Sequence, residues 1–564
     1  MINREKFLKA LAAVLAFGAV AGFLVWRAPF GYADLDECFP VTVAYRLHLG
    51  DALIVDERFG AQLSHLVIYP FFLLYHSIVG SMTGILLASR LFFAAAVLAA
   101  AIFHFAVWRR TSFTGALLGA VAFAIFAPFS IMLFTYYSIE VVSCSLILSL
   151  LLAKPFQRDV RHALVGFFLA LAVMANPYLV LAYPVYSVYE LLLGKSLRRW
   201  IAITAGCAAL GLPVLAFIFL RAPASDVFAS VKYLFDDPGH PSETLVQMLQ
   251  TWWKAMINQQ GQWTPYLMAF AGILPGVLAV SFPKFFEPRR LLLHAWSALT
   301  GLLWVYLATF KSVLAFPDYP MTPLAFIALG FALTSGKRDI RVGAVLAFAA
   351  TLLVDFASCC ASNQDRIRVA TCMAILSPMA MTWMWAVAAE QTANRPRSAV
   401  ASRIFAALFC LSAICAITYL RYDVVFWEPR MSNPNQRLDA TIPDGAHKGI
   451  VTTKFKFEKK HRRIQSDVLK AVELCGTRKL LCTAGDPLCY IFAEREISGY
   501  SAWMAENDPN TFEKLETYYA MRPHKIPDTI IFTRHNPKLE KAFLAAGYKN
   551  AGRYLNFPVL MRHE

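Results

Sequence analysis

The chain has 564 residues, of which 58% are hydrophobic and only 16% are charged. A soluble protein of this length would carry about 25% charged residues, so the composition predicts a membrane protein and disfavours a soluble enzyme. The net charge of +16 does not indicate nucleic-acid binding, because the basic residues stand in short clusters between apolar runs. We therefore expect no nucleic-acid partner.

Thirteen apolar stretches approach the roughly 20 residues of helix that the hydrocarbon core of a bilayer requires. The first follows Arg4, Lys6 and Lys9 and imitates a signal peptide, but no small-x-small cleavage site follows it. We therefore predict an uncleaved first helix. The stretches lie at 8–27, 83–108, 113–133, 136–153, 162–178, 179–194, 200–220, 264–283, 291–310, 320–336, 341–358, 371–389 and 403–420.

Every second connection between these stretches is basic, whereas the intervening connections are poor in Lys and Arg. The positive-inside rule assigns the basic side, and with it the N-terminus, to the cytoplasm. An odd number of crossings then places everything after Leu420 outside. We predict a transmembrane part, 1–420, and an extracytoplasmic soluble domain, 421–564. The chain has no Asn-x-Ser/Thr sequon, which fits the inner membrane of a bacterium.

Two of the predicted outer loops are long, at 28–82 and 221–263. In the first, a helix is expected to begin near Pro40, and the apolar stretch from Leu66 to Tyr75 is too short to span and is expected to lie along the membrane surface. The second carries Trp252 and Trp253, which are typical of an interfacial anchor.

The C-terminal part alternates strand-like runs with helix-like runs, which predicts a small α/β domain. The runs are Gly449–Thr453, Lys479–Thr483 and Thr529–Thr533 for strands, and Ile464–Leu474 and Lys538–Ala546 for helices. No phosphate-binding glycine motif is present. Cys475, Cys482 and Cys489 could form one disulfide if this part is extracytoplasmic, and the sequence does not say which pair.

A basic run at 459–463 in the same part is typical of a solvated face, and contact with anionic lipid or a polyanionic glycan is the alternative.

Asp34, Asp36 and Glu37 follow directly on the first predicted helix. Clustered carboxylates repel one another, which raises the pKa of at least one and suits a general base or a divalent-cation site. The structural alternative is a solvated loop in which Asp36 or Glu37 caps the following helix.

The order of these parts resembles the membrane-embedded glycosyltransferases that use polyprenyl-phosphate sugars, the GT-C superfamily of protein O-mannosyltransferases and aminoarabinose lipid A transferases. The resemblance rests on Asp36-Glu37 after the first helix, the Arg46 to Gly50-Asp51 continuation, Arg90 in SerArgLeuPhe, and Glu140 near the start of the fourth helix. It implies about thirteen helices and an extracytoplasmic C-terminal domain.

Two departures stand out. Gln62 to His65 replace a Glu-Lys-Pro motif of the lipid A branch, and Ala175 to Tyr178 replace its Lys-Gly.

The resemblance further implies that Asp36 acts as the general base, and that Glu37 and Glu140 orient it or help it to bind a divalent metal ion. Cations on the outer side would hold the phosphate of the donor. The candidates for this phosphate site are Arg58, His65, Lys311 and Arg366, with Arg368 nearby. For each of these cations, a snorkelling or solvated charge is the plain alternative.

These features predict an integral membrane glycosyltransferase that moves a sugar from a polyprenyl-phosphate donor to an extracytoplasmic hydroxyl, with inversion. The acceptor, whether protein, lipid or glycan, stays open. A transporter or flippase of lipid-linked glycans is the rival, and it predicts charges near the bilayer midplane and repeated halves. A scaffold of an envelope complex would leave the Asp36 cluster without a role.

Overall fold

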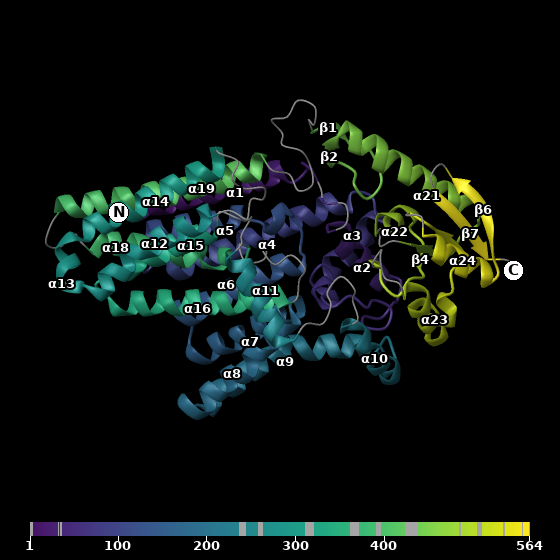
Figure 1. The fold of residues 1–564 in the computed structure, drawn as a ribbon, viewed down its shortest axis with the longest axis horizontal. Helices are drawn as coiled ribbons and strands as arrows, with labels where there is room; N and C mark the ends of the chain where they lie inside the picture. The colour runs from purple at the N-terminus through teal and green to yellow at the C-terminus, as the bar shows by residue number, and fades with distance from the viewer. Residues whose placement is uncertain are drawn as a thin grey trace.

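The computed structural model describes residues 4–31, 33, 36–235, 244–257, 263–310, 321–360, 371–390, 396–423, 438–483, 487–504, 510–533, 536–554 and 557–562. Over these residues the chain forms a bundle of long helices and ends in a small α/β domain (Figure 1). The N-terminus lies at the end of the bundle opposite to the C-terminal domain. The predicted fold class, a polytopic helical membrane protein with a small α/β domain, is confirmed.

Eight helical stretches within the described residues are long and apolar enough to cross a membrane. They comprise α1 (Arg4–Arg27), α4 (Ile85–Trp108), α6 (Tyr136–Ala153), α9 (Leu197–Phe219), α12 (Thr264–Ser281), the stretch Pro283–Thr309 formed by α13 (Pro283–Phe286), η7 (Glu287–Arg289) and α14 (Arg290–Phe310), α16 (Arg338–Cys360), and α19 (Pro396–Asp423).

The other predicted stretches also contain helix. They hold α5 (Phe113–Ile125), α7 (Arg158–Ala175), the series η3 (Pro177–Leu181), α8 (Ala182–Val188) and η4 (Tyr189–Leu193), α15 (Met321–Leu333), and η8 (Met373–Leu376) with α18 (Ser377–Glu390). Thirteen crossings therefore stay a prediction, while a helix at each predicted place is observed. The turn η2 (Pro128–Ser130) precedes α6.

Small residues allow neighbouring helices of the bundle to pack closely. A Cβ atom on Gly330 of α15 would lie 2.1 Å from the carbonyl oxygen of Gly272 in α12. A Cβ atom on Gly272 would lie 2.3 Å from a side-chain carbon of Ile327. Close backbone contact through glycine is typical of helices that associate in a bilayer, where the hydrophobic effect does not drive helices together.

The two predicted outer loops are largely helical. The first contains α2 (Cys38–His48), η1 (Gln62–Val67) and α3 (Tyr69–Val79), and the second contains α10 (Ala224–Val231), η5 (Lys232–Phe235) and α11 (Leu245–Ile257). The helix predicted near Pro40 is confirmed, with its first residue at Cys38. Leu74 and Ile78 of α3 expose their side chains, as expected for a helix that lies against the bilayer surface.

The C-terminal domain holds a five-stranded sheet in the order β4-β3-β5-β7-β6, with β3 parallel to β4 and β5 and the other pairs antiparallel. A separate pair, β1 and β2, is antiparallel. The predicted strands and helices are all present, and the hairpin β6–β7 was not predicted. The strands are β1 (Leu438–Thr441), β2 (Val451–Thr453), β3 (Lys479–Cys482), β4 (Glu496–Ile497), β5 (Thr529–Ile531), β6 (Tyr548–Tyr554) and β7 (Phe557–Arg562).

The helices of this domain are α20 (Lys454–Lys456), η10 (Phe457–Arg462), α21 (Arg463–Leu474), α22 (Pro487–Ala493), α23 (Thr511–Met521), η11 (Pro523–Lys525) and α24 (Pro537–Ala545). Cys475, Cys482 and Cys489 carry no disulfide in the structure, and the last two are buried.

The C-terminal domain is joined to the bundle by backbone hydrogen bonds. The amide of Val451 in β2 donates to the carbonyl of Pro29 at 2.7 Å, and the amide of Gly31 donates back to Val451 at 2.8 Å. The amide of Gly84, just before α4, donates to the carbonyl of Gly445 at 2.9 Å. One continuous hydrophobic core also contains residues of both parts. The domain is therefore packed onto the ends of α1 and α4.

Candidate functional site

The carboxylate of Glu37 is fully engaged. Its Oε2 atom accepts from Nη2 of Arg90 at 2.5 Å and from the amide of Ala33 at 3.2 Å. Its Oε1 atom accepts from the amide of Met132 at 3.2 Å, in the segment that precedes α6. Glu37 occupies the N-cap position of α2, but its side chain makes no cap hydrogen bond. The alternative that the Glu37 side chain caps α2 is therefore wrong.

Arg90 completes this arrangement from α4. Its Nη1 atom donates to the carbonyl of Ala28 at 2.6 Å, just after the end of α1. Both Arg90 and Glu37 are buried. A buried ion pair needs further hydrogen bonds to offset the cost of burial. Those of this pair tie together α1, α2, α4 and the segment before α6, while Nε of Arg90 makes no hydrogen bond within the described residues. Glu37 thus fixes the loop and has its oxygen atoms occupied by protein donors.

Asp36 immediately precedes Glu37 and remains partly exposed. Glu37 anchors the backbone next to Asp36, because its carboxylate accepts hydrogen bonds from Arg90 and from the amide of Ala33. Cys38, two residues after Asp36, places its Sγ atom 3.4 Å from Nε2 of His447 in the C-terminal domain. Asp36 is therefore the member of the predicted acidic pair that solvent can reach.

Glu140 lies buried near the start of α6 and joins three helices. Its Oε1 atom accepts from Nδ2 of Asn176 at 2.8 Å and from Oγ of Ser358 at 2.5 Å. Asn176 ends α7 and Ser358 lies near the end of α16. In the sequence, Asn176 stands out only as part of a departure from the family pattern. The structure gives that asparagine a partner, the acid predicted to help bind a metal.

Arg58 lies in a cage of aromatic rings. Its guanidinium carbon is 4.1 Å from the ring centroid of Tyr233, 5.4 Å from that of Tyr518 and 5.8 Å from that of Tyr500. Burial lowers the pKa of Arg58. One of its nitrogen atoms, Nη1, is buried without a hydrogen-bond partner. Arg58 therefore joins the first loop, the second loop and the C-terminal domain.

His65 is buried in η1, with its ring edge-on to Phe39 of α2 at a centroid distance of 4.8 Å. Within the part of the chain that the structure describes, neither ring nitrogen atom has a hydrogen-bond partner, and nor does Nε2 of Gln62 one turn earlier. Burial lowers the pKa of His65 to about 3. The imidazole is therefore neutral near pH 7 and does not supply a charge for a phosphate there.

The remaining predicted site residues, Asp34, Lys311, Arg366 and Arg368, lie outside the described residues. The part of the chain that the structure describes contains no group of three or more His, Cys, Asp or Glu side chains that could hold a metal ion. Asp36 and Glu140 are therefore not part of such a group. The metal ion stays a prediction whose further ligands the described residues do not supply.

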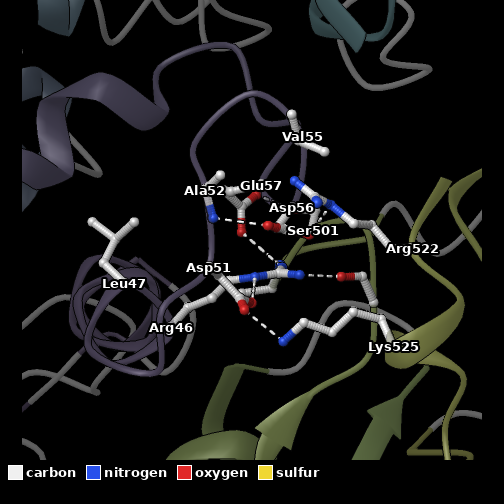
Figure 2. A network of polar contacts seen from close by, with 12 residues as sticks. Arg46, Leu47, Asp51, Ala52, Val55, Asp56, Glu57, Ser501, Arg522 and Lys525 are labelled. Carbon is white, nitrogen blue, oxygen red and sulfur yellow. Dashed lines mark hydrogen bonds and ion pairs between the residues drawn. The ribbon is translucent and has the colours of Figure 1, made fainter. Parts of the chain in front are cut away.

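A second polar centre, which the sequence did not predict as a site, lies at the C-terminal end of α2 (Figure 2). The guanidinium of Arg46 donates from Nε to Asp51 at 2.7 Å and from Nη1 to Glu57 at 3.4 Å. Its Nη2 atom donates to the carbonyl of Gly499 and, at 3.3 Å, to the hydroxyl of Tyr518. Arg46 is completely buried. The Arg46 to Asp51 motif of the first loop thus binds the C-terminal domain.

The C-terminal domain contributes charged residues to the same network. Lys525 lies 2.5 Å from Asp51, and Arg522 lies 3.5 Å from Asp56. Glu57 accepts from the hydroxyl of Ser501 and from the amide of Ala502. Figure 2 shows the acids on the first loop facing the two basic side chains of the C-terminal domain. We call these six charged residues the interdomain clamp, comprising Arg46, Asp51, Asp56, Glu57, Arg522 and Lys525.

The clamp balances three cations against three carboxylates. Burial raises the pKa of Glu57, and the nearby guanidinium of Arg46 opposes that shift. No signal in the sequence pairs the first loop with the C-terminal domain, because their contacts, such as that between Arg46 and Gly499, join residues as far as 453 positions apart.

Neither a protein-family model nor a curated protein sequence matches this chain. A solved structure, that of ArnT from Cupriavidus metallidurans in the apo state, aligns with 98% of this chain and 98% of its own, at 13% identity and a TM-score of 0.43. A likeness at this TM-score carries no conclusion about fold or function, which therefore rest on the residues described above.

Proposed function

We propose that this protein is an integral membrane glycosyltransferase of a bacterial inner membrane. It transfers a sugar from a polyprenyl-phosphate donor to a hydroxyl on an extracytoplasmic acceptor, with Asp36 as the general base. The observation that carries the proposal is the restrained and partly exposed carboxylate of Asp36 beside the fully occupied carboxylate of Glu37. The resemblance of the Asp36-Glu37 pair to the polyprenyl-phosphate-dependent enzymes supports the same assignment.

In this reaction the acceptor oxygen attacks the anomeric carbon as Asp36 takes the hydroxyl proton. The bond between the anomeric carbon and the phosphate oxygen breaks, and the electron pair leaves with the polyprenyl phosphate. Attack opposite to the leaving group inverts the anomeric centre. Cations in the outer loops would stabilise the departing phosphate, and Lys311 and Arg366, which the sequence predicts in such loops, are the candidates for this role. Glu37 and Arg90 hold the loop that carries Asp36.

The positive-inside rule supports an extracytoplasmic site. The basic connections and the N-terminus would face the cytoplasm, and the C-terminal domain would cover the opposite end of the bundle, where Asp36 lies.

A divalent ion at Asp36 is a second part of the proposal. Transfer that is lost after dialysis against a chelator and returns with Mg²⁺ or Mn²⁺ would support it.

The test is transfer of radiolabel from undecaprenyl-phosphate sugars to envelope fractions, in membranes that carry the wild-type protein or Asp36→Asn. We expect labelled product with the wild type and a loss of roughly a hundredfold or more in the variant, because the base is removed. Asp339→Asn is the matched control, since this exposed acid lies at the start of α16. Its transfer rate should stay within about twofold of the wild type.

Two results would overturn the proposal. An unchanged rate in Asp36→Asn would remove this residue from the mechanism and direct attention to Glu140. Lipid-linked sugar that crosses the bilayer without transfer to any acceptor would identify a transporter instead.

A further inference from the structure

A basic helical segment opens the C-terminal domain after β2. It spans residues 454–463 and contains six Lys or Arg residues and one acid, Glu458. The segment is continuous helix, with a π-helical stretch from Phe457 to Arg462 between α20 and α21. Lys454 and Arg462 are exposed, whereas Lys456 is buried. Single π-helical stretches inside a helix are uncommon and frequently occur at functional sites.

The position of this segment is fixed by the strand that precedes it. Val451 exchanges backbone hydrogen bonds with Pro29 and Gly31, which directly follow the end of α1. Helix α1 has 24 residues, or about 36 Å at 1.5 Å per residue, which exceeds the roughly 30 Å of the hydrocarbon core. Pro29 and Gly31 therefore lie at the level of the lipid headgroups.

The basic segment begins three residues after this contact. Ten helical residues extend only about 15 Å. Figure 1 shows the helix that contains α21 starting beside β1 and β2 and running out to the sheet. The first turns of the segment are thus within about a Debye length of the bilayer surface, where phosphate charges still act on them.

The segment is basic although the predicted connections on the same side of the membrane contain few Lys and Arg residues. The other connections on the side of the C-terminal domain are poor in Lys and Arg, whereas this stretch concentrates six of them. The topology does not require basic residues there, because the positive-inside rule concerns the cytoplasmic side. Each basic residue near an anionic surface contributes to binding, so several within ten residues favour the binding of phosphate groups.

We propose that the basic helical segment binds the phosphate groups of anionic phospholipids and thereby seats the C-terminal domain on the bilayer. The partner is bilayer lipid rather than a glycan, because the segment starts at the headgroup level. Lys456 is not part of the binding face, since its side chain is buried. This inference is independent of the proposed reaction.

The test is hydrogen exchange of the segment in the full-length protein, in nanodiscs of phosphatidylcholine or of phosphatidylcholine with about one third phosphatidylglycerol. We expect exchange of the peptides that cover 454–463 to be about threefold or more slower in the anionic discs. The protection should disappear in about 1 M salt, which screens charges beyond about 3 Å.

The variant Lys454→Gln/Lys459→Gln/Lys460→Gln should lose the difference between the two kinds of disc. The matched control, Lys538→Gln/Lys541→Gln/Lys549→Gln, removes the same charge from exposed residues on and beside α24. It should still show slower exchange in the anionic discs. An unchanged thermal midpoint of the first variant in detergent shows that it is folded.

Equal exchange of the wild type in both discs would overturn the proposal, as would an equal loss of protection in the control variant. Protection by an added acidic polysaccharide in phosphatidylcholine discs, with none from phosphatidylglycerol, would assign the segment to a glycan.

Discussion

The two ends of helix α2 carry charged residues that are held in different ways. At its C-terminal end, Arg46 pairs with Asp51 and Glu57 within the first loop. Lys525 and Arg522 of the C-terminal domain complete the interdomain clamp by pairing with Asp51 and Asp56. At its N-terminal end, Glu37 is paired with Arg90, but the adjacent Asp36 keeps part of its surface exposed.

Helix α2 has eleven residues, and its two ends are assigned different roles, a structural one at the clamp and a proposed chemical one beside Asp36. A buried charge that already has its partners cannot bind a substrate without breaking those contacts, so the clamp stabilises the domain arrangement. A partly exposed carboxylate beside a fixed neighbour can exchange protons with a bound hydroxyl. The C-terminal domain is accordingly held against the first loop by buried charge pairs and hydrogen bonds.

The largest effect is expected from Arg46→Met, which breaks the centre of the clamp. It leaves Glu57 buried with its countercharge removed, and we expect a loss of about 5 kcal/mol in the free energy of unfolding. Chemical denaturation of the detergent-solubilised protein measures it. Arg478→Met, at an exposed position, should change it by less than about 0.5 kcal/mol. Equal stability of both variants would show that the clamp does not hold the domains together.

The second prediction concerns the N-terminal end of α2. Glu37→Gln keeps the shape of the side chain but leaves Arg90 buried without a countercharge, so we expect a loss of about 3 kcal/mol in unfolding free energy. The double variant Glu37→Gln/Arg90→Met removes both charges and should recover part of that loss. Strictly additive losses would mean that the two side chains do not interact.

The third prediction uses pH. Burial holds the pKa of His65 at about 3, while the same side chain in the unfolded chain titrates near 6.5. The stability that neutral His65 contributes is therefore present above pH 6.5 and is lost as the pH falls from 6.5 towards 3. Between pH 7 and pH 5 the wild type should lose about 2 kcal/mol more unfolding free energy than His65→Phe.

His524→Phe provides the comparison for this pH effect, because His524 is exposed. Denaturation curves of all three proteins at both pH values measure the difference. If His65→Phe follows the wild-type pH dependence, another group is responsible for it.

The smallest effect on stability is expected from Asp36→Asn. The side chain is partly exposed, so its free energy of unfolding should stay within about 0.5 kcal/mol of the wild type while transfer activity falls. This combination separates a catalytic residue from a structural one. A loss of several kcal/mol would instead place Asp36 with Glu37 among the residues that hold the loop.

Much of the architecture follows from local properties of the chain. A helix is found at each of the thirteen apolar stretches that the sequence predicted, because the bilayer requires each backbone polar group to be bonded within its own segment. Alternating apolar runs predicted β3, β5, α21 and α24. The hairpin β6–β7 escaped prediction because its first strand contains Lys549, Asn550 and Arg553 and shows little apolar alternation.

The candidate site was predictable only in part. The sequence by itself determined the membrane class and the helices, since both depend on the length and charge of contiguous segments. It also marked Asp36-Glu37 and Arg90, and a charge such as Arg90 inside an apolar helix is costly without a partner.

Only the tertiary structure decided that Glu37 is that partner, that Arg58 lies among tyrosine rings, and that Arg46 binds the C-terminal domain. The physical reason is that these contacts join segments from 53 to more than 400 residues apart, and a buried charge selects its partner by packing rather than by neighbours in the chain.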